Sequence, residues 1–236
     1  MNLVLFEPEE AGRPLPHDDV RARHVVDVLR RGVGDRFDAG VVDGPRGNAT
    51  ITASDAAGLH LRFEPTAEPP PLPAITLVVA TPRPATTKDV LRDATTLGVC
   101  AVHFVHAERC TPSYATASLW TPPAVRQQLW LGAAQAFDTR LPHVTWGRPL
   151  AVVLAEVGGP GRPPLVALDN YEATTALGAM AGRPPLTLAF GPERGWGPHD
   201  RAALRASGAT LAHLGARVLR LETAVTAAVA IVGARG

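Results

Sequence analysis

The sequence has little of several features that mark particular protein classes. Its only two cysteines, Cys100 and Cys110, form neither a CxxC pair nor a disulfide framework, so we expect buried, inert thiols. No apolar run is long enough to cross a bilayer. The N-terminal stretch has no basic region and reaches acidic residues early, which is unlike a secretory signal. We therefore expect a cytoplasmic protein without a membrane segment.

Several short catalytic and binding motifs are also absent. There is no G-x-G-x-x-G fingerprint and no G-x-x-x-x-G-K-[ST] loop, which argues against a standard dinucleotide or P-loop nucleotide site. A G-x-S-x-G nucleophile elbow is missing as well. His103 and His106 point to opposite faces of a predicted strand, and no Cys/His cluster has ligand spacing, so we expect no metal site.

Lysine is almost missing. Of the 23 cationic residues 22 are arginine, and Lys88 is the exception, although the net charge is only +1. GC-rich coding explains this bias, but arginine still supplies planar, bidentate phosphate contacts wherever it clusters. Six arginines fall at or before Arg36. For the four in or beside the first predicted helix a solvated helix face is an equally open interpretation: Arg21, Arg23, Arg30 and Arg31.

Residues 1–68 are predicted to form a small β-rich domain with one helix. The helix is expected over His17–Arg31, with Asp18 or Asp19 as its cap and Gly32 as its end. Short strands joined by tight turns suggest a small barrel. These strands are Leu3–Phe6, Arg36–Val42, Asn48–Ala53 and Leu59–Phe63. Five prolines within residues 64–74 predict a stiff linker before the next domain.

Residues 73–236 alternate between apolar strand-like runs and helical patterns, which predicts a parallel sheet with helices on both faces. The expected strands are Ile75–Ala80, Ala101–Val105, Leu165–Asp169, Leu186–Phe190 and Thr210–Leu214. The expected helices are Thr86–Leu97 with a Thr86/Asp89 cap, a helix from Pro122 to about Phe137, Leu150–Glu156, Ala173–Met180, His199–Ser207 and Arg220–Val232.

Two of these strands run directly into loops rich in glycine. GPERGWGP begins at Gly191, and LGARVLRLETA begins at Leu214. Ligands of α/β proteins usually bind at the carboxyl ends of strands, so we expect the loops to form two walls of one pocket. A simple strand-to-helix turn is the alternative for the first loop. Arg220 and Glu222 lie off the apolar stripe of the last helix, beside this pocket, although Glu222 could merely complement the helix dipole.

These motifs resemble the SPOUT superfamily of knotted methyltransferases, and specifically the RsmE family of 16S ribosomal RNA uridine-N3 methyltransferases. That family has GPEGG where residues 191–195 read GPERG, and LG-x-x-[IV]-LR-x-ETA where residues 214–224 read LGARVLRLETA. His24, Val28 to Arg30 and Gly34–Asp35 fit its H-x-x-x-VLR-x-x-x-GD pattern. The resemblance covers nearly the whole chain.

The resemblance implies a fold and an activity. It implies a small PUA-like β-barrel over 1–68 that binds RNA, followed over 73–236 by a SPOUT-type trefoil-knotted parallel sheet with helices on both faces. The knotted domain would bind S-adenosylmethionine and form a homodimer. The expected activity is S-adenosylmethionine-dependent methylation of the N3 of a specific uridine in 16S ribosomal RNA of the small subunit.

The resemblance and the pocket interpretation together give a set of candidate site residues. Arg220 and Glu222 are the catalytic candidates, because methylation of uracil N3 needs help with its proton and with the negative charge that develops on the base. The candidates for binding the cofactor are Leu168, Phe190, Gly191, Pro192, Glu193, Gly195, Leu214, Gly215, Arg217, Val218 and Leu219. The candidates for binding RNA are Arg23, His24, Arg30, Arg109 and Arg140.

Four positions depart from the family pattern. Arg194 replaces a glycine, Thr96 an acid, Cys110 a serine and Asp138 an arginine. Two other functions therefore stay open. One is a related SPOUT methyltransferase acting on another RNA, such as transfer RNA. The other is a non-catalytic RNA-binding or ribosome-assembly protein of the same fold.

Overall fold

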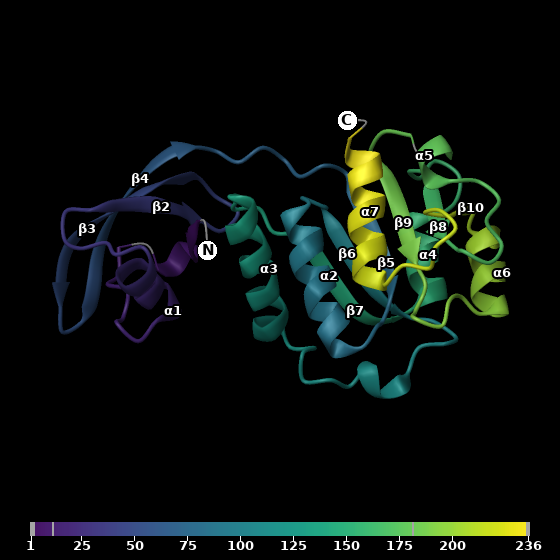
Figure 1. Ribbon diagram of the computed structural model, residues 1–236, viewed down its shortest axis with the longest axis horizontal. Coiled ribbons are helices and arrows are strands. Elements are labelled where there is room, and N and C mark those ends of the chain that lie inside the picture. The colour runs from purple at the N-terminus through teal and green to yellow at the C-terminus, as the bar shows by residue number, and fades with distance from the viewer. Residues whose placement is uncertain (1–2, 11, 181, 235–236) are drawn as a thin grey trace. The chain divides into compact units, whose positions relative to one another are not determined.

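The computed structural model describes residues 3–10, 12–180 and 182–234 (Figure 1). The chain divides into two compact units. The first holds the described residues up to Pro71 together with Trp130–Leu141, and the second holds Leu72–Leu129 and the described residues from Pro142 onward. The division falls within helix α3 (Pro122–Ala136): its residues up to Leu129 belong to the second unit, and those from Trp130 onward belong to the first.

The first unit is built on a four-stranded sheet in the order β1-β2-β3-β4. The strands are β1 (Val4–Phe6), β2 (Arg36–Val41), β3 (Arg46–Asp55) and β4 (Gly58–Ala67). Alternate residues such as Ala49 and Ile51 are buried in a small core because side chains of a strand alternate between its faces. Closure of this sheet into a barrel stays a prediction.

The predicted linker begins later than expected, because β4 continues through residues 64–67. Proline is tolerated here because β4 is the last strand of the sheet and is paired only with β3 near residue 65. Pro65 lies beside a register shift at Gly47.

The prediction of one helix over His17–Arg31 is wrong in its extent. Helix α1 covers only Val20–Arg23, capped by the Asp19 side chain, and continues as a single π-helical segment, η2 (His24–Val28). Arg30 then adopts a φ of 56°. Val20 and Val28 are more than 60% exposed, so the apolar spacing in the sequence does not correspond to a buried stripe.

Arg21 is not on a solvated helix face, contrary to the alternative interpretation of the sequence. Its guanidinium is buried, forms ion pairs with Glu10 and Asp19, and donates to the carbonyl of Leu5. It also lies 5.3 Å from the ring centroid of Trp130, on α3. The hydrogen bond from Arg21 is the main cause of a lowered pKa at Glu10. Arg21 therefore contacts the part of α3 that begins at Trp130 and belongs to the first unit.

The second unit contains a six-stranded, fully parallel sheet in the order β10-β8-β9-β5-β6-β7. The strands are β5 (Ile75–Ala80), β6 (Ala101–His106), β7 (His143–Pro149), β8 (Leu165–Leu168), β9 (Leu186–Phe190) and β10 (Thr210–Ala212). β7 was not predicted, because its sequence HVTWGRP contains glycine and proline and is only partly buried at the edge of the sheet.

Helices cover both faces of this sheet, as predicted (Figure 1). Val78 and Ala80 of β5 share a core with α4 (Leu150–Val157) and α6 (Pro198–Ala206). Leu77 and Val79 are completely buried and point to the opposite face, where α2 (Pro84–Thr96) packs against α7 (Leu221–Gly233). The knotted path of the chain stays a prediction.

Two helix starts differ from the expected ones. α2 begins at Pro84 with Arg83 in the cap position, so the predicted Thr86/Asp89 cap is wrong; proline suits a first turn because its missing N–H is not needed there. α5 covers only Leu177–Met180 and not the whole of Ala173–Met180. The residues before α5 instead form turns after β8, and these turns belong to the site described next.

Candidate functional site

Three neighbouring strands place their following loops at one edge of the sheet. β8 pairs with both β9 and β10, and Leu168 lies opposite Phe190 on one side and Ala212 on the other. Because the strands are parallel, the loops that begin at Asp169, Gly191 and His213 all leave the same edge. This register brings together segments that are far apart in the sequence.

These loops enclose a pocket that we call the glycine-loop pocket. It is lined by Leu168, Asp169, Asn170, Tyr171, Phe190, Gly191, Pro192, Glu193, Gly195, Trp196, Leu214, Val218, Leu219, Leu221 and Ala224. Nine of the eleven predicted cofactor-binding residues are therefore in this lining. Gly215 and Arg217 are not. The amide of Gly215 instead donates to His213 Nδ1, and the carbonyl of Arg217 accepts a hydrogen bond from Asn170.

Two glycines of the first loop lie against aromatic rings. A Cβ at Gly191 would come within 3.2–3.3 Å of the indole of Trp196, and one at Gly195 would lie 2.9 Å from Tyr171 Cε2. Gly195 also has a φ of +70°, which side chains rarely tolerate. Trp196 is completely buried, and its Nε1 donates to the carbonyl of Leu168 at 3.1 Å. The loop thus packs tightly behind the pocket while its backbone stays accessible to a ligand.

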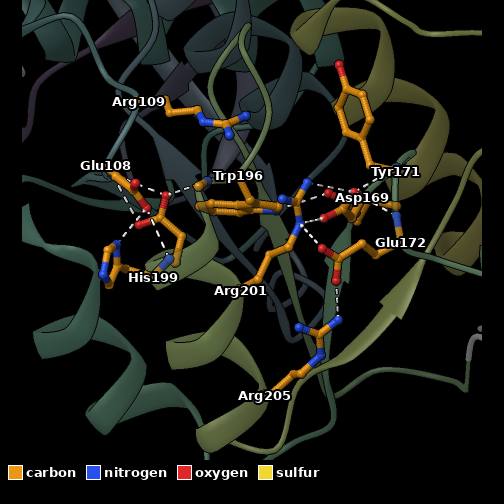
Figure 2. Close-up of polar contacts among 12 residues, drawn as sticks. Glu108, Arg109, Asp169, Tyr171, Glu172, Trp196, His199, Arg201 and Arg205 are labelled. Atoms are coloured by element: carbon orange, nitrogen blue, oxygen red, sulfur yellow. Dashed lines mark hydrogen bonds and ion pairs between the residues drawn. The ribbon is translucent and has the colours of Figure 1, made fainter.

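An ion pair between Asp169, in the pocket lining, and Arg201 supports the loop after β8 (Figure 2). The side chains of Asp169 and Arg201 are 1% and 10% exposed and form two hydrogen bonds with each other. Asp169 Oδ1 also accepts the amides of Tyr171 at 2.7 Å and Glu172 at 3.3 Å. Burial acts to raise the pKa of Asp169, but these hydrogen bonds outweigh it and hold the pKa below its usual range. The pair fixes the shape of the loop after β8.

A second pocket, which we call the arginine pocket, adjoins the first. It is lined by Arg83, Thr86, Arg109, Thr111, Tyr114, Glu193, Arg194, Val218, Leu219, Arg220, Leu221 and Glu222. Glu193, Val218, Leu219 and Leu221 line both pockets. Because the two pockets share these residues, a ligand in the glycine-loop pocket can approach a second ligand in the arginine pocket where the pockets adjoin.

Both predicted catalytic residues lie in the arginine pocket. Arg220 occupies the N-cap position of α7, and Glu222 is in the first turn of that helix. Four arginines face two glutamates around this pocket, so its electrostatic potential favours an anionic ligand. Arg109 additionally donates to the carbonyl of Arg194 at 3.1 Å and thereby connects the loop after β6 to the first glycine loop.

A second set of contacts holds the loop after β6 against the start of α6 (Figure 2). The carboxylate of Asp200 accepts the amides of Glu108 and Gly197. Glu108 Oε2 in turn accepts the amide of His199 at 3.1 Å. A Cβ at Gly197 would lie 2.0 Å from Glu108 Oε2, so any larger residue would displace the Glu108 side chain. These contacts fix Arg109, the next residue, at the edge of the arginine pocket.

The other predicted RNA-binding residues belong to the first unit and line neither pocket. Arg23 and Arg30 are exposed, and His24 is half-buried. Arg140 donates to the carbonyls of Asp43 and Pro69 at 3.4 Å each, so it has structural contacts within the first unit. RNA binding by these four residues stays a prediction.

Some lining residues were not predicted from the sequence. In the glycine-loop pocket they are Asp169, Asn170, Tyr171, Trp196, Leu221 and Ala224; in the arginine pocket they are Arg83, Thr86, Thr111, Tyr114 and Arg194. The position of Asp169 to Tyr171 directly after a buried strand was a usable signal, because polar residues at strand carboxyl ends often meet ligands. Tyr114 lies in a 3-10 helical turn, Pro112–Tyr114, between β6 and α3 and gave no such signal.

No group of three Asp, Glu, His or Cys side chains in the described part of the chain could hold a metal ion. None of the helices in residues 3–10, 12–180 and 182–234 is both long and apolar enough to span a membrane.

Comparison with known proteins gives consistent matches. Residues 68–233 match the model of the RNA methyltransferase domain. The chain is 33% identical to ribosomal RNA small subunit methyltransferase E of Treponema pallidum, over 98% of this chain and 90% of that protein. It is 28% identical to the protein of the same name in Mycobacterium bovis, over 89% of this chain and 82% of that protein.

A solved structure shows the same fold. The crystal structure of a ribosomal RNA small subunit methyltransferase E from Neisseria gonorrhoeae, bound to S-adenosyl methionine, matches with a TM-score of 0.75 at 22% identity. The match covers 98% of this chain and 95% of that chain.

Proposed function

Because the chain belongs to the RNA methyltransferase family that includes ribosomal RNA small subunit methyltransferase E, we propose that it methylates the N3 of a uridine in 16S ribosomal RNA with S-adenosylmethionine. The observation that carries this proposal is the pair of adjoining pockets. The lining of one is mainly apolar and includes Gly191 and Gly195, the lining of the other contains four arginines, and four residues line both. Methyl transfer needs a donor and an acceptor in this arrangement.

The glycine-loop pocket fits S-adenosylmethionine. Gly191 and Gly195 let Trp196 and Tyr171 pack closely against the loop, and Leu214 and Leu219 add apolar surface to the lining. When bound, the cofactor supplies an activated methyl group on a sulfonium centre. The chain's own residues must then hold the cofactor and the acceptor in line, because orientation is the main contribution that a protein makes to such a transfer.

The acceptor base would lie in the arginine pocket. Uracil N3 carries a proton and becomes a good nucleophile only when that proton leaves, which places negative charge on O2 and O4. We assign Arg220 to stabilise this charge, since a guanidinium cannot act as a base. We assign Glu222, two residues further along the chain, to orient the base or to take part in the proton transfer. The target base must be unpaired or flipped out to enter the pocket.

The remaining parts of the proposal concern RNA and assembly. Arg23 and Arg30 in the first unit and Arg109 at the arginine pocket would contact phosphates. A homodimer formed through the second unit, a knotted path in that unit and a cytoplasmic location follow from the family resemblance. Each of these is an expectation for this chain.

The reaction can be tested directly. Purified protein is incubated with methyl-labelled S-adenosylmethionine and small ribosomal subunits from a bacterial strain that lacks its own uridine-N3 methyltransferase. We expect labelled 3-methyluridine in 16S ribosomal RNA after nuclease digestion and nucleoside chromatography. Label only in transfer RNA, or label in a different nucleoside, would contradict the proposed substrate. Absence of S-adenosylmethionine binding in calorimetry would contradict methyl transfer altogether.

Arg194 provides a prediction about RNA binding. Its side chain is exposed and lines the arginine pocket, so we expect Arg194→Ala to weaken RNA binding several-fold and to reduce the slope of log affinity against log salt by about 1. Affinity for S-adenosylmethionine should stay within twofold. The measurement is a salt titration of RNA binding by fluorescence anisotropy.

A matched control is Arg162→Ala, because Arg162 is also exposed but lies beside Pro163 and Ser207, away from both pockets. An equal loss of RNA affinity in both variants would mean that Arg194 acts only through overall charge.

A further inference from the structure

Tyr171 is a large aromatic side chain that the protein leaves exposed at the wall of the glycine-loop pocket. It is 72% exposed, although burying a tyrosine ring is favourable. Tyr171 lies in the loop directly after β8 and is part of the pocket lining. An exposed ring at a pocket wall is a ready surface for a planar, apolar part of a ligand.

The ring is held in place by three contacts (Figure 2). The amide of Tyr171 donates to Asp169 Oδ1 at 2.7 Å, which fixes the backbone. The ring packs against the Cα of Gly195, where any larger residue would collide with it. The guanidinium of Arg201, itself fixed by Asp169, lies 5.7 Å from the ring centroid. A ligand that uses this ring therefore meets a surface that is already ordered, which lowers the entropic cost of binding.

The position of Tyr171 indicates which part of the cofactor it meets. The reacting methyl must point toward the arginine pocket, at the place where the two pockets adjoin beside Val218 and Leu219. Tyr171 lines the glycine-loop pocket alone, so it is away from the reacting end. Two parts of S-adenosylmethionine extend away from the sulfonium, namely the adenosine and the charged amino-acid tail.

The charges near Tyr171 exclude the amino-acid tail. That tail carries an ammonium and a carboxylate and needs charged or polar partners. Both oxygens of Asp169 already accept hydrogen bonds from Arg201 or from backbone amides. Arg201 is in turn neutralised by Asp169 and by Glu172, at 3.4 Å. Asn170 also lines this pocket, and its side-chain amide donates to the carbonyl of Arg217. The main surface that this segment offers a ligand is the aromatic face of Tyr171, which matches the adenine ring.

We propose that Tyr171 stacks on the adenine ring of S-adenosylmethionine and that the Asp169–Arg201 pair positions it. This inference rests on the proposed function. Stacking of a base on an aromatic side chain is worth roughly 1–3 kcal/mol, which corresponds to about 5-fold to 150-fold in affinity. Tyr171 contributes affinity and not chemistry, because it is remote from the transferred methyl.

The experiment is isothermal calorimetry with S-adenosylmethionine and with S-adenosylhomocysteine, which keeps the adenine but has no sulfonium charge. Tyr171→Ala should raise both dissociation constants by the same factor, about 10-fold or more. Tyr171→Phe and Tyr171→Trp should retain affinity within about 3-fold, whereas Tyr171→Leu should resemble the alanine variant. At saturating cofactor, kcat should be unchanged while KM for the cofactor rises.

The outcomes separate this inference from the proposed function. If the wild-type protein binds neither ligand, the proposed function fails. If the wild type binds and Tyr171→Ala binds equally well, the inference fails alone. Loss of affinity for S-adenosylmethionine only would indicate contact with the sulfonium and would overturn adenine stacking, as would full rescue by leucine. Phe137→Ala is the matched control, since this ring is 38% exposed in the first unit and lines neither pocket.

Discussion

Arg220→Ala is expected to lower kcat for RNA methylation by about 10²–10³-fold while the affinity for S-adenosylmethionine stays within about threefold. Arg220 stands at the N-cap of α7 and lines the arginine pocket only, so its guanidinium is available to the acceptor and not to the cofactor. In the proposed reaction, negative charge develops on the uracil as its N3 proton leaves. Removing the cation that faces this charge raises the barrier and leaves cofactor binding intact.

The measurement is single-turnover methylation with saturating RNA and cofactor, because this separates the chemical step from binding. Arg220→Lys keeps the charge but loses the planar donor pair, so we expect a partial loss. Arg162→Ala should retain full activity. An unchanged kcat in Arg220→Ala, together with a raised KM for RNA, would reassign Arg220 to RNA binding.

Asp169→Asn is expected to reduce the free energy of unfolding by about 3 kcal/mol at neutral pH. Asp169 and Arg201 form an almost fully buried pair, and the substitution leaves the Arg201 guanidinium with only the partly exposed Glu172 as a counter-ion. Removing one partner of a buried pair leaves an uncompensated charge in a poorly solvated place. The measurement is urea unfolding followed by the fluorescence of the tryptophans, one of which, Trp196, is buried and donates to the carbonyl of Leu168, the residue before Asp169.

The pH dependence gives this prediction a second, independent readout. The folded-state pKa of Asp169 is held below its usual range by Arg201, so its contribution to stability is fully present above the unfolded-state pKa, near 4. That contribution is lost as the pH falls through the lowered folded-state pKa. The stability difference between wild type and Asp169→Asn should therefore shrink in acid, below about pH 4.

Arg205→Ala is the control for the buried pair. Arg205 binds Glu172 on the surface, with side chains that are 52% and 41% exposed, so the loss should be under about 1 kcal/mol. If Asp169→Asn were no more destabilising than Arg205→Ala, the buried pair would not stabilise the fold.

The sheet of the second unit was largely predictable because its strands are short apolar runs between turn signals. β5 and β9 match the predicted strands, and the glycine-rich loops after β9 and β10 form the pocket that the sequence indicated. The strand β7 was not predicted, because partial burial at the sheet edge gives no apolar run. Local patterns predict what is fully buried much better than what is half-exposed.

Near the N-terminus, the sequence pattern predicted a longer regular helix than the structure contains. Val20 and Val28 have helical spacing, yet both are exposed, and a π-helical segment replaces the regular helix after Arg23. Arg21 is buried there together with Ala22 and Val25, and it is held by the neighbouring Asp19, by Glu10 and by the rings of Phe6 and Trp130. A buried arginine depends on tertiary partners, so no local pattern could have predicted it.

The candidate site likewise contains one part that the sequence predicted and one part that it did not. The glycine motifs identified one pocket from local sequence alone. Arg83 and Tyr114 were not predicted as site residues, because each reaches its pocket only through the order of strands in the sheet. Tyr171 was missed although it closely follows a buried strand. The pair Asp169–Arg201 likewise joins a strand end to a later helix, and the sequence contains no motif for it.

The strand order of the second unit also has a consequence for how the chain folds during synthesis. β5 lies in the middle of the sheet, between β6, which follows soon after, and β9, which is made much later. While the ribosome adds residues 81–185, β5 can pair with β6 but leaves its other edge unsatisfied. Such long-range parallel pairing is slow, and an open apolar strand edge is prone to aggregation. We therefore expect the nascent chain to need protection, by the ribosome or a chaperone, until Leu186–Phe190 emerges and completes the centre of the sheet.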